Sequence, residues 1–152
     1  GCKISPDVVR RLSVHPNVMG IKEASGDMSY AMQIARYLSD DFVMYSGNDD
    51  ITIPLMSIGG SGVISVFANV MPKKCHEIVR EYLTGDRTRA VAEHLRYLRL
   101  MNDLFLEVNP IPVKTALNLM GLNAGPMRLP LYEMSAEARG KLEATMQEAG
   151  LL

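Results

Sequence analysis

The sequence predicts an α/β protein that begins with a short parallel sheet and ends in an all-helical segment. Through residue 84, three short apolar runs alternate with stretches of helical periodicity, which is the pattern of consecutive strand–helix units. From residue 85 to 152 only helical periodicity remains, interrupted by prolines and glycines. We therefore expect a parallel sheet with crossover helices over 1–84 and a helical extension over 85–152.

The composition is that of a globular protein and argues against several other classes. The chain has 152 residues, of which 47% are hydrophobic and 22% charged, so it can bury a real core. A net charge of -1 argues against nucleic acid or an anionic membrane surface as a partner. No apolar run approaches the ~20 residues of a membrane span. Two cysteines, Cys2 and Cys75, are too few for a disulfide framework, so we expect a reducing, cytoplasmic location.

The elements of the first part have recognisable boundaries. Ser5 is a helix cap followed by proline, and the helix ends before His15. Ser25 or Asp27 caps a second helix. Strands are expected over 18–22, 42–46 and 63–66, a short helix over 53–56, and a further helix that begins at Asn69 or Pro72 and stops at Gly85.

The second part reads as consecutive helices. Asp86 caps a long helix whose apolar stripe indicates core or a contact between subunits; the stripe comprises Val91, Leu95, Leu98, Met101 or Asn102, and Phe105. Pro112 opens a helix that ends at Gly121, residues 129–131 are extended, and Ser135 caps the last helix.

Lys22 is the residue most suggestive of chemistry. It ends the first predicted strand, and alternation places Val18, Gly20 and Lys22 on one face. Gly20 would leave room below the lysine for a long side chain or for a small molecule bonded to it. In sheets built from βα units, active sites lie at the carboxyl ends of the strands. The ordinary alternative is a solvated lysine at a turn.

Other candidate motifs favour structural roles. The run Gly59-Gly60-Ser61-Gly62 precedes a strand, whereas phosphate loops follow one, so it predicts a tight turn. The acids Asp27, Asp49 and Asp50 fit caps and turns better than a metal cluster. His15, His76 and His94 share no ligand spacing, so we expect no metal site.

Five segments together resemble the dihydrodipicolinate synthase family of pyruvate-dependent class I aldolases. They cover essentially the whole chain in order: Ile21-Lys22-Glu23-Ala24-Ser25-Gly26-Asp27, Tyr45-Ser46-Gly47-Asn48-Asp49-Asp50, Gly60 to Asn69, Asn109-Pro110-Ile111-Pro112-Val113-Lys114, and Arg128-Leu129-Pro130-Leu131. The resemblance implies a (β/α)8, or TIM, barrel with a helical carboxyl-terminal extension. This chain would supply the last three strands (1–84) and the extension (85–152). Since it starts at Gly1, we expect a fragment that lacks the amino-terminal half of the barrel.

The resemblance also implies the site and its chemistry. Lys22 would form a Schiff base with pyruvate, without metal or organic cofactor, and the derived enamine would attack aspartate semialdehyde in lysine and diaminopimelate biosynthesis. Only about one in a thousand free lysines is neutral near pH 7.4, and burial favours the neutral, nucleophilic amine. Ile64 would offer its backbone carbonyl to pyruvate, Gly47 would border the pocket, and Asn109 and Pro110 would line it. A homotetramer is the family's usual assembly.

Two alternatives stay open. One is N-acetylneuraminate lyase or another sugar-acid aldolase, which shares the Schiff-base lysine and the glycine-rich third strand. The stretch from Asn109 to Lys114 favours the synthase. The other alternative is a truncated, non-catalytic assembly module.

Overall fold

The computed structural model describes residues 3–152, which form two compact units, one up to Ser65 and one from Val66 to Leu152. The sequence pattern predicts the boundary between the sheet-containing part and the helical extension at residue 84, which is later in the chain. Helix α4 (Pro72–Thr84) belongs to the second unit because it packs on the helix that follows it. The assignment of 1–84 to the barrel stays a prediction, and Cys2 lies outside the described residues.

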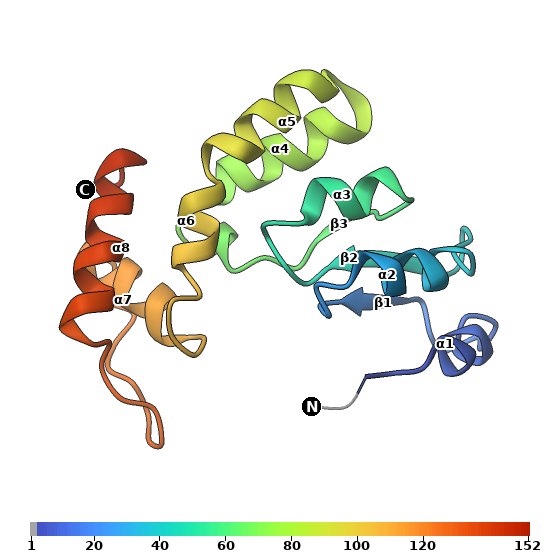
Figure 1. Ribbon diagram of the computed structural model, residues 1–152, viewed down its shortest axis with the longest axis horizontal. Helices are drawn as coiled ribbons and strands as arrows, with labels where there is room; N and C mark the ends of the chain where they lie inside the picture. The colour runs from blue at the N-terminus through green and yellow to red at the C-terminus, as the bar shows by residue number, and fades with distance from the viewer. Residues whose placement is uncertain (1–2) are drawn as a thin grey trace. The chain divides into compact units, whose positions relative to one another are not determined.

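The first unit holds the predicted parallel sheet (Figure 1). Its strands pair in the order β1-β2-β3, and both pairings are parallel. In chain order the elements are α1 (Pro6–Leu12), β1 (Gly20–Glu23), α2 (Met28–Ala35), β2 (Val43–Ser46), α3 (Thr52–Ser57) and β3 (Gly62–Val63). Each strand is therefore joined to the next through a helix, as the alternation of patterns predicts.

Side-chain caps fix where the first two helices begin. The Ser5 hydroxyl accepts a hydrogen bond from the backbone N–H of Val8, as predicted. The carboxylate of Asp27 accepts the Tyr30 N–H at 3.0 Å, which identifies Asp27 as the cap of α2. The other candidate, Ser25, instead accepts the Asp27 N–H at 3.1 Å and so shapes the turn before the cap.

Only one face of the sheet is covered within the first unit. Met44 is fully buried there in a cluster contributed by α1, α2, α3 and the strands: Val9, Tyr30, Ala31, Ile34, Phe42 and Leu55. Burying each larger member of this cluster contributes roughly 1.5–3 kcal/mol. Strand alternation sends Lys22 and Tyr45 to the opposite face, and both are exposed.

The third strand is shorter than the predicted span of 63–66. Only Gly62 and Val63 form β3, and the N–H of Ile64 extends the pairing by donating to the Ser46 carbonyl at 2.8 Å. The chain then turns into a 3-10 helix, η1 (Phe67–Asn69), where Phe67 is buried. Asn69 is therefore part of η1 and not the cap of α4.

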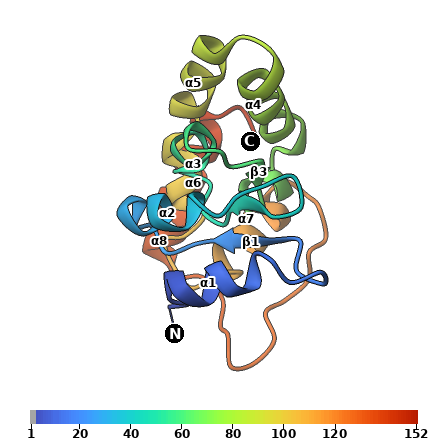
Figure 2. The ribbon, with the colours of Figure 1, turned by 90° about the vertical axis from the view of Figure 1, so that its right-hand side faces the viewer.

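The second unit is helical, as expected. After η1 and α4 come α5 (Arg87–Arg96), α6 (Leu98–Asp103), α7 (Ile111–Leu119) and α8 (Ala136–Glu148). Asp86 and Ser135 cap α5 and α8 with their side chains, as the sequence predicts. Figure 2 shows α4 and α5 side by side as a hairpin. None of the helices within residues 3–152 has the length and apolar character that crossing a bilayer requires.

The long helix predicted after Asp86 is two helices, because the chain breaks at Tyr97 between α5 and α6. Tyr97 is buried with its ring 5.7 Å from that of Phe67. The buried face therefore runs through Ala90, His94, Tyr97, Met101 and Leu104. Residues from the predicted stripe lie outside it: Val91, Leu95 and Phe105 are exposed. Their role in a subunit contact stays a prediction.

The segment 129–131 is also different from its prediction. It is a tight turn, closed by a hydrogen bond from the Leu131 N–H to the Arg128 carbonyl at 3.0 Å. Proline fits a turn as well as an extended segment, so the residue types alone did not separate the two.

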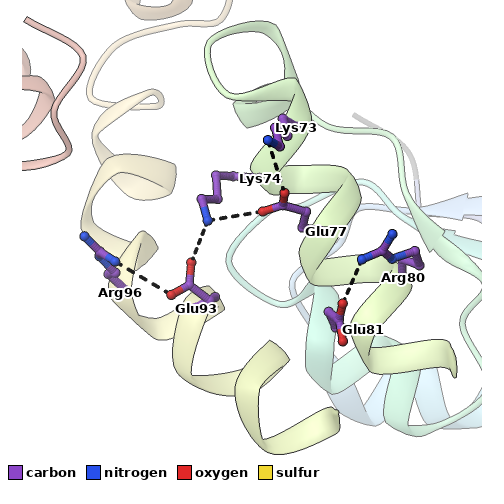
Figure 3. A network of polar contacts seen from close by, with 7 residues as sticks. All are labelled: Lys73, Lys74, Glu77, Arg80, Glu81, Glu93 and Arg96. Atoms are coloured by element: carbon purple, nitrogen blue, oxygen red, sulfur yellow. Dashed lines mark hydrogen bonds and ion pairs between the residues drawn. The ribbon is translucent and has the colours of Figure 1, made fainter. Parts of the chain in front are cut away.

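Ion pairs join α4 to α5 on the surface of the second unit (Figure 3). The Lys74 amine lies 3.1 Å from Glu77 on its own helix and 3.2 Å from Glu93 on α5. Arg96 extends the network to Glu93 at 3.7 Å. Lys74 therefore links the two helices through Glu93.

This network predicts a pH-dependent contribution to stability. The hydrogen bond from Lys74 lowers the pKa of Glu77 below its ordinary 4.5, and the bonds to Glu77 and Glu93 raise the pKa of Lys74 above 10.5. The stabilisation by Glu77 is thus present above pH 4.5 and is lost as the pH falls through its lowered pKa; that of Lys74 is lost only as the pH rises through its raised pKa.

Thermal unfolding followed by circular dichroism tests this link. At low salt, we expect the melting temperature of Lys74→Met to fall less at acidic pH than that of the parent protein. At high salt, we expect the two proteins to differ less in this respect. Lys73→Met is the matched control, because the Lys73 side chain is 88% exposed and its amine lies 3.9 Å from Glu77. If the melting temperature of Lys74→Met depended on pH as that of the parent does, Lys74 would not be the partner that lowers the pKa of Glu77.

Candidate active site at the carboxyl end of the sheet

Lys22 lies near the carboxyl end of β1, next to the last residue of the strand. In the register of the sheet it stands opposite Tyr45 of β2. Gly62 of β3 pairs with Tyr45, so Ile64, two residues further on, belongs to the same face. Tyr45 is 39% exposed and Ile64 50%. The face of the sheet that carries Lys22 therefore also carries the phenol of Tyr45 and the branched alkyl side chain of Ile64.

Gly47 is the residue that leaves room for the Lys22 side chain. A Cβ atom on Gly47 would lie 2.8 Å from Lys22 Cε and 2.5 Å from Ala24 Cβ. The Gly47 N–H donates to the Glu23 carbonyl at 2.6 Å, so the loop after β2 is held against the end of β1. Only a residue without a side chain allows this approach.

Gly20 has a packing role that the sequence did not indicate. An added Cβ there would overlap the Val43 carbonyl oxygen on β2 and come within 3.1 Å of Val43 Cγ2. The sequence indicated that Gly20 leaves space beneath Lys22 for a ligand. The structure shows that Gly20 allows the close approach of β1 to β2, and that the space beside the lysine comes from Gly47.

A hollow of about 460 Å³ opens beside Lys22 along the edge of β1 that faces away from β2. It is large enough for a small organic acid, and its lining combines amines, a carboxylate and a phenol ring: Lys3, Ile4, Ile21, Lys22, Glu23, Ala24, Ser25 and Tyr30. Burial and the charge of Glu23 raise the pKa of the Tyr30 phenol. Its hydroxyl donates to the Ile4 carbonyl at 2.7 Å.

Three of the predicted site residues are thus gathered at one end of the sheet, namely Lys22, Gly47 and Ile64. Asn109 and Pro110 belong to the second unit, where Pro110 directly precedes α7. Their contribution to the lysine's site stays a prediction. Among residues 3–152, no group of three or more His, Cys, Asp or Glu side chains is arranged to hold a metal ion.

Two residues of this region were missed as candidates. Tyr45 belongs to one of the resembling motifs, and its pairing with Lys22 depends on the register of the sheet, which the sequence alone does not give. Glu23 is 2% exposed at the end of β1. The sequence did contain a signal for Glu23, because strand alternation places this acid on the apolar side of β1. Carboxylates are almost never fully buried without a partner, so such an acid is a candidate for a specific role.

The chain has a lysine at the carboxyl end of a parallel βα sheet, with a small hollow beside it. This arrangement is typical of the βα proteins whose active sites lie at the carboxyl ends of the strands. The model of the dihydrodipicolinate synthetase family matches residues 1–149, and the chain belongs to that family. Its fold is the carboxyl-terminal part of the family's (β/α)8 barrel with the helical extension.

Individual relatives support the same assignment. The chain is 51% identical over 148 residues to 4-hydroxy-tetrahydrodipicolinate synthase of Thermoanaerobacter sp. (strain X514), covering 97% of this chain and 50% of the relative. It is 45% identical to the synthase of Clostridium perfringens (strain SM101 / Type A), covering 100% of this chain and 52% of that protein. The chain thus spans about half the length of these curated relatives.

Solved structures of the family match the fold closely. Dihydrodipicolinate synthase from Cyanidioschyzon merolae, crystallised with lysine bound, superposes with a TM-score of 0.94 at 38% identity, over 100% of this chain and 52% of that one. A monomeric dihydrodipicolinate synthase variant gives 0.93 at 39% identity, over 100% and 52% of the two chains.

Proposed function

We propose that this chain carries the Schiff-base lysine of an enzyme that condenses pyruvate with aspartate semialdehyde, a step in lysine and diaminopimelate biosynthesis. The observation that carries the proposal is the position of Lys22 at the strand end, with Gly47 clearing space for its side chain. Relatives of 45–51% identity are named 4-hydroxy-tetrahydrodipicolinate synthase, which favours this reaction over the cleavage of sialic or sugar acids.

The proposed reaction uses the side-chain amine as a covalent catalyst. Neutral Lys22 attacks the ketone carbon of pyruvate, and loss of water gives an imine. The protonated imine withdraws electrons, so a methyl proton leaves and an enamine forms. The enamine carbon attacks the aldehyde carbon of aspartate semialdehyde. The amine of that substrate then displaces Lys22 from the imine carbon by transimination, which closes the ring and frees the enzyme. The proposal includes no metal or organic cofactor.

The surroundings of the reaction are part of the proposal. Ile64 would present its backbone carbonyl to pyruvate, and Asn109 and Pro110 would border the pocket. The enzyme would be a cytoplasmic homotetramer, with no nucleic acid or membrane as partner. One solved relative is described as a monomeric variant, so assembly is open to direct measurement by sedimentation.

A chimaera provides the test. It joins the amino-terminal half of the Thermoanaerobacter synthase, which this chain does not match, to residues 1–152. We expect it to consume pyruvate and aspartate semialdehyde together and to leave N-acetylneuraminate untouched. Cleavage of N-acetylneuraminate would favour the aldolase alternative. A folded chimaera without either activity would favour the non-catalytic module.

Residues 1–152 alone are expected to self-associate or to be poorly stable, and not to turn over substrate. The face of the sheet with Lys22, Tyr45 and Ile64 is exposed, and β1 and β3 each pair with a single strand. Lys22 lies on this exposed face, which lacks the opposing wall of the barrel. Sedimentation and a coupled assay check this; a monomeric chain that melts cooperatively and is active would contradict it.

Substitution of Gly20 tests the close approach of β1 to β2 at that residue. We expect Gly20→Ala to lower the free energy of unfolding of the chimaera by about 1–3 kcal/mol, because the methyl group pushes β1 from β2. Urea unfolding measures the change. Unaltered unfolding together with lost activity would restore the earlier interpretation of Gly20 as the floor of the pocket.

A further inference from the structure

In the sheet of the described residues, the side chain that flanks Lys22 within its own row is that of Tyr45. The register pairs Tyr45 with Lys22 on β1 and with Gly62 on β3, so these three residues form one row across the sheet. Register partners point to the same face, and their strands lie about 4.8 Å apart, so the phenol ring rises from the sheet beside the alkyl chain of the lysine. Gly62 adds no side chain to this row. The ring of Tyr45 is therefore the wall that this row provides.

The next row towards the carboxyl end of the sheet is open in its middle. Gly47 lies there, directly after β2, and an added Cβ on it would lie 2.8 Å from Lys22 Cε. The end of the lysine side chain is therefore beside Gly47. Ile64 follows β3 on the same face, and its side chain is exposed. A molecule bonded to the Lys22 amine thus occupies the space over Gly47, between the ring of Tyr45 and the alkyl side chain of Ile64.

These two side chains favour one substituent of a lysine-bound 2-oxo acid over the other. The imine carbon carries a carboxylate and an alkyl group. The face of a phenol ring and a branched alkyl chain form an apolar surface, against which a carboxylate loses hydration without compensation. An alkyl group gains free energy from the same contact. The alkyl group therefore lies against Tyr45 and Ile64.

We propose that Tyr45 is a specificity-determining residue, whose ring limits the alkyl group of the 2-oxo acid on Lys22 to the single carbon of pyruvate. The ring occupies space that Gly47 and Gly62 leave open, so the longer chain of 2-oxobutyrate would overlap it. One methylene group in an apolar pocket changes kcat/KM by about 10- to 200-fold. The inference rests on the proposed function, because it requires an imine on Lys22.

Competition between two 2-oxo acids in the chimaera tests the proposal. The protein is incubated briefly with equal concentrations of pyruvate and 2-oxobutyrate and reduced with borohydride. Mass spectrometry then compares the two adducts on Lys22, which differ by one methylene group. We expect the pyruvate adduct to exceed the other by about tenfold or more in the parental chimaera, and Tyr45→Ala to lower this excess by about tenfold. Tyr45→Phe retains the ring and should retain the excess.

Tyr132→Ala is the matched control, because it also removes a phenol, from a side chain that is 74% exposed in the second unit. It should leave the ratio of adducts unchanged. Tyr45→Leu removes the ring but keeps an apolar side chain, so it decides the question if the alanine variant does not fold, and the excess should fall in this variant too.

An unchanged ratio in the variants that lack the ring would overturn the proposal, as would a parental chimaera without preference. Equal losses of preference in Tyr45→Phe and Tyr45→Ala would also overturn it, because the hydroxyl and not the ring would then be responsible. If the parental chimaera forms neither adduct on Lys22, the proposed function itself fails, and this inference fails with it. Pyruvate trapped on Lys22 with an unchanged ratio in the variants rejects this inference alone.

Discussion

Lys22→Ala in the chimaera is expected to reduce the condensation of pyruvate with aspartate semialdehyde by on the order of 10⁴-fold or more, because no covalent intermediate can then form. Its removal should cost little free energy of unfolding, because an amine enclosed by the complete barrel carries a desolvation cost that alanine does not. Steady-state assays and urea unfolding on the same preparation separate the two effects.

A nearby lysine is the control for this substitution. Lys3 lines the same hollow and pairs with Asp27, but it lies outside the sheet. Lys3→Met should retain most of the activity. Substantial turnover by Lys22→Ala, or an equal loss in both variants, would remove Lys22 from its role as the nucleophile.

Gly47→Val is expected to have the second largest effect. Its Cβ would fall 2.8 Å from Lys22 Cε and 2.5 Å from Ala24 Cβ, so the lysine has to leave its position or the loop has to move. We expect imine formation to slow by about a hundredfold, with an overpacking cost of roughly 1–3 kcal/mol. The rate at which borohydride fixes pyruvate to the protein measures the first effect, and urea unfolding the second.

Gly140→Ala is the matched control for Gly47. Gly140 lies within α8, and an added Cβ would have no atom within 4 Å. Alanine there should stabilise the protein by about 0.5–1 kcal/mol without altering imine formation, because glycine is a poor helix former. A Gly47→Val variant that behaves like Gly140→Ala would show that Lys22 does not need the space beside Gly47.

The parts of the fold that depend on local signals could be predicted from the sequence. Ser5, Asp27, Asp86 and Ser135 cap helices through hydrogen bonds to residues three positions on, so a short stretch of sequence suffices to find them. The parallel order of the strands also followed from the alternation of elements.

The features that depend on distant contacts were misjudged. The break at Tyr97 lies where this residue packs against Phe67, thirty positions earlier in the sequence, and helical periodicity does not contain that information. Gly20 and Gly47 look alike in sequence, and only the neighbouring strand decides that one meets Val43 and the other meets Lys22. The burial of Glu23 is likewise visible only in the folded chain.

The most direct test of the central claim identifies the lysine that bonds to pyruvate. The chimaera is incubated with pyruvate, reduced with borohydride, digested and examined by mass spectrometry. The account predicts that one peptide gains the mass of a reduced pyruvate and that fragmentation assigns the added mass to Lys22. Modification of any other lysine in place of Lys22, or no modification of a chimaera that turns over substrate, would contradict it.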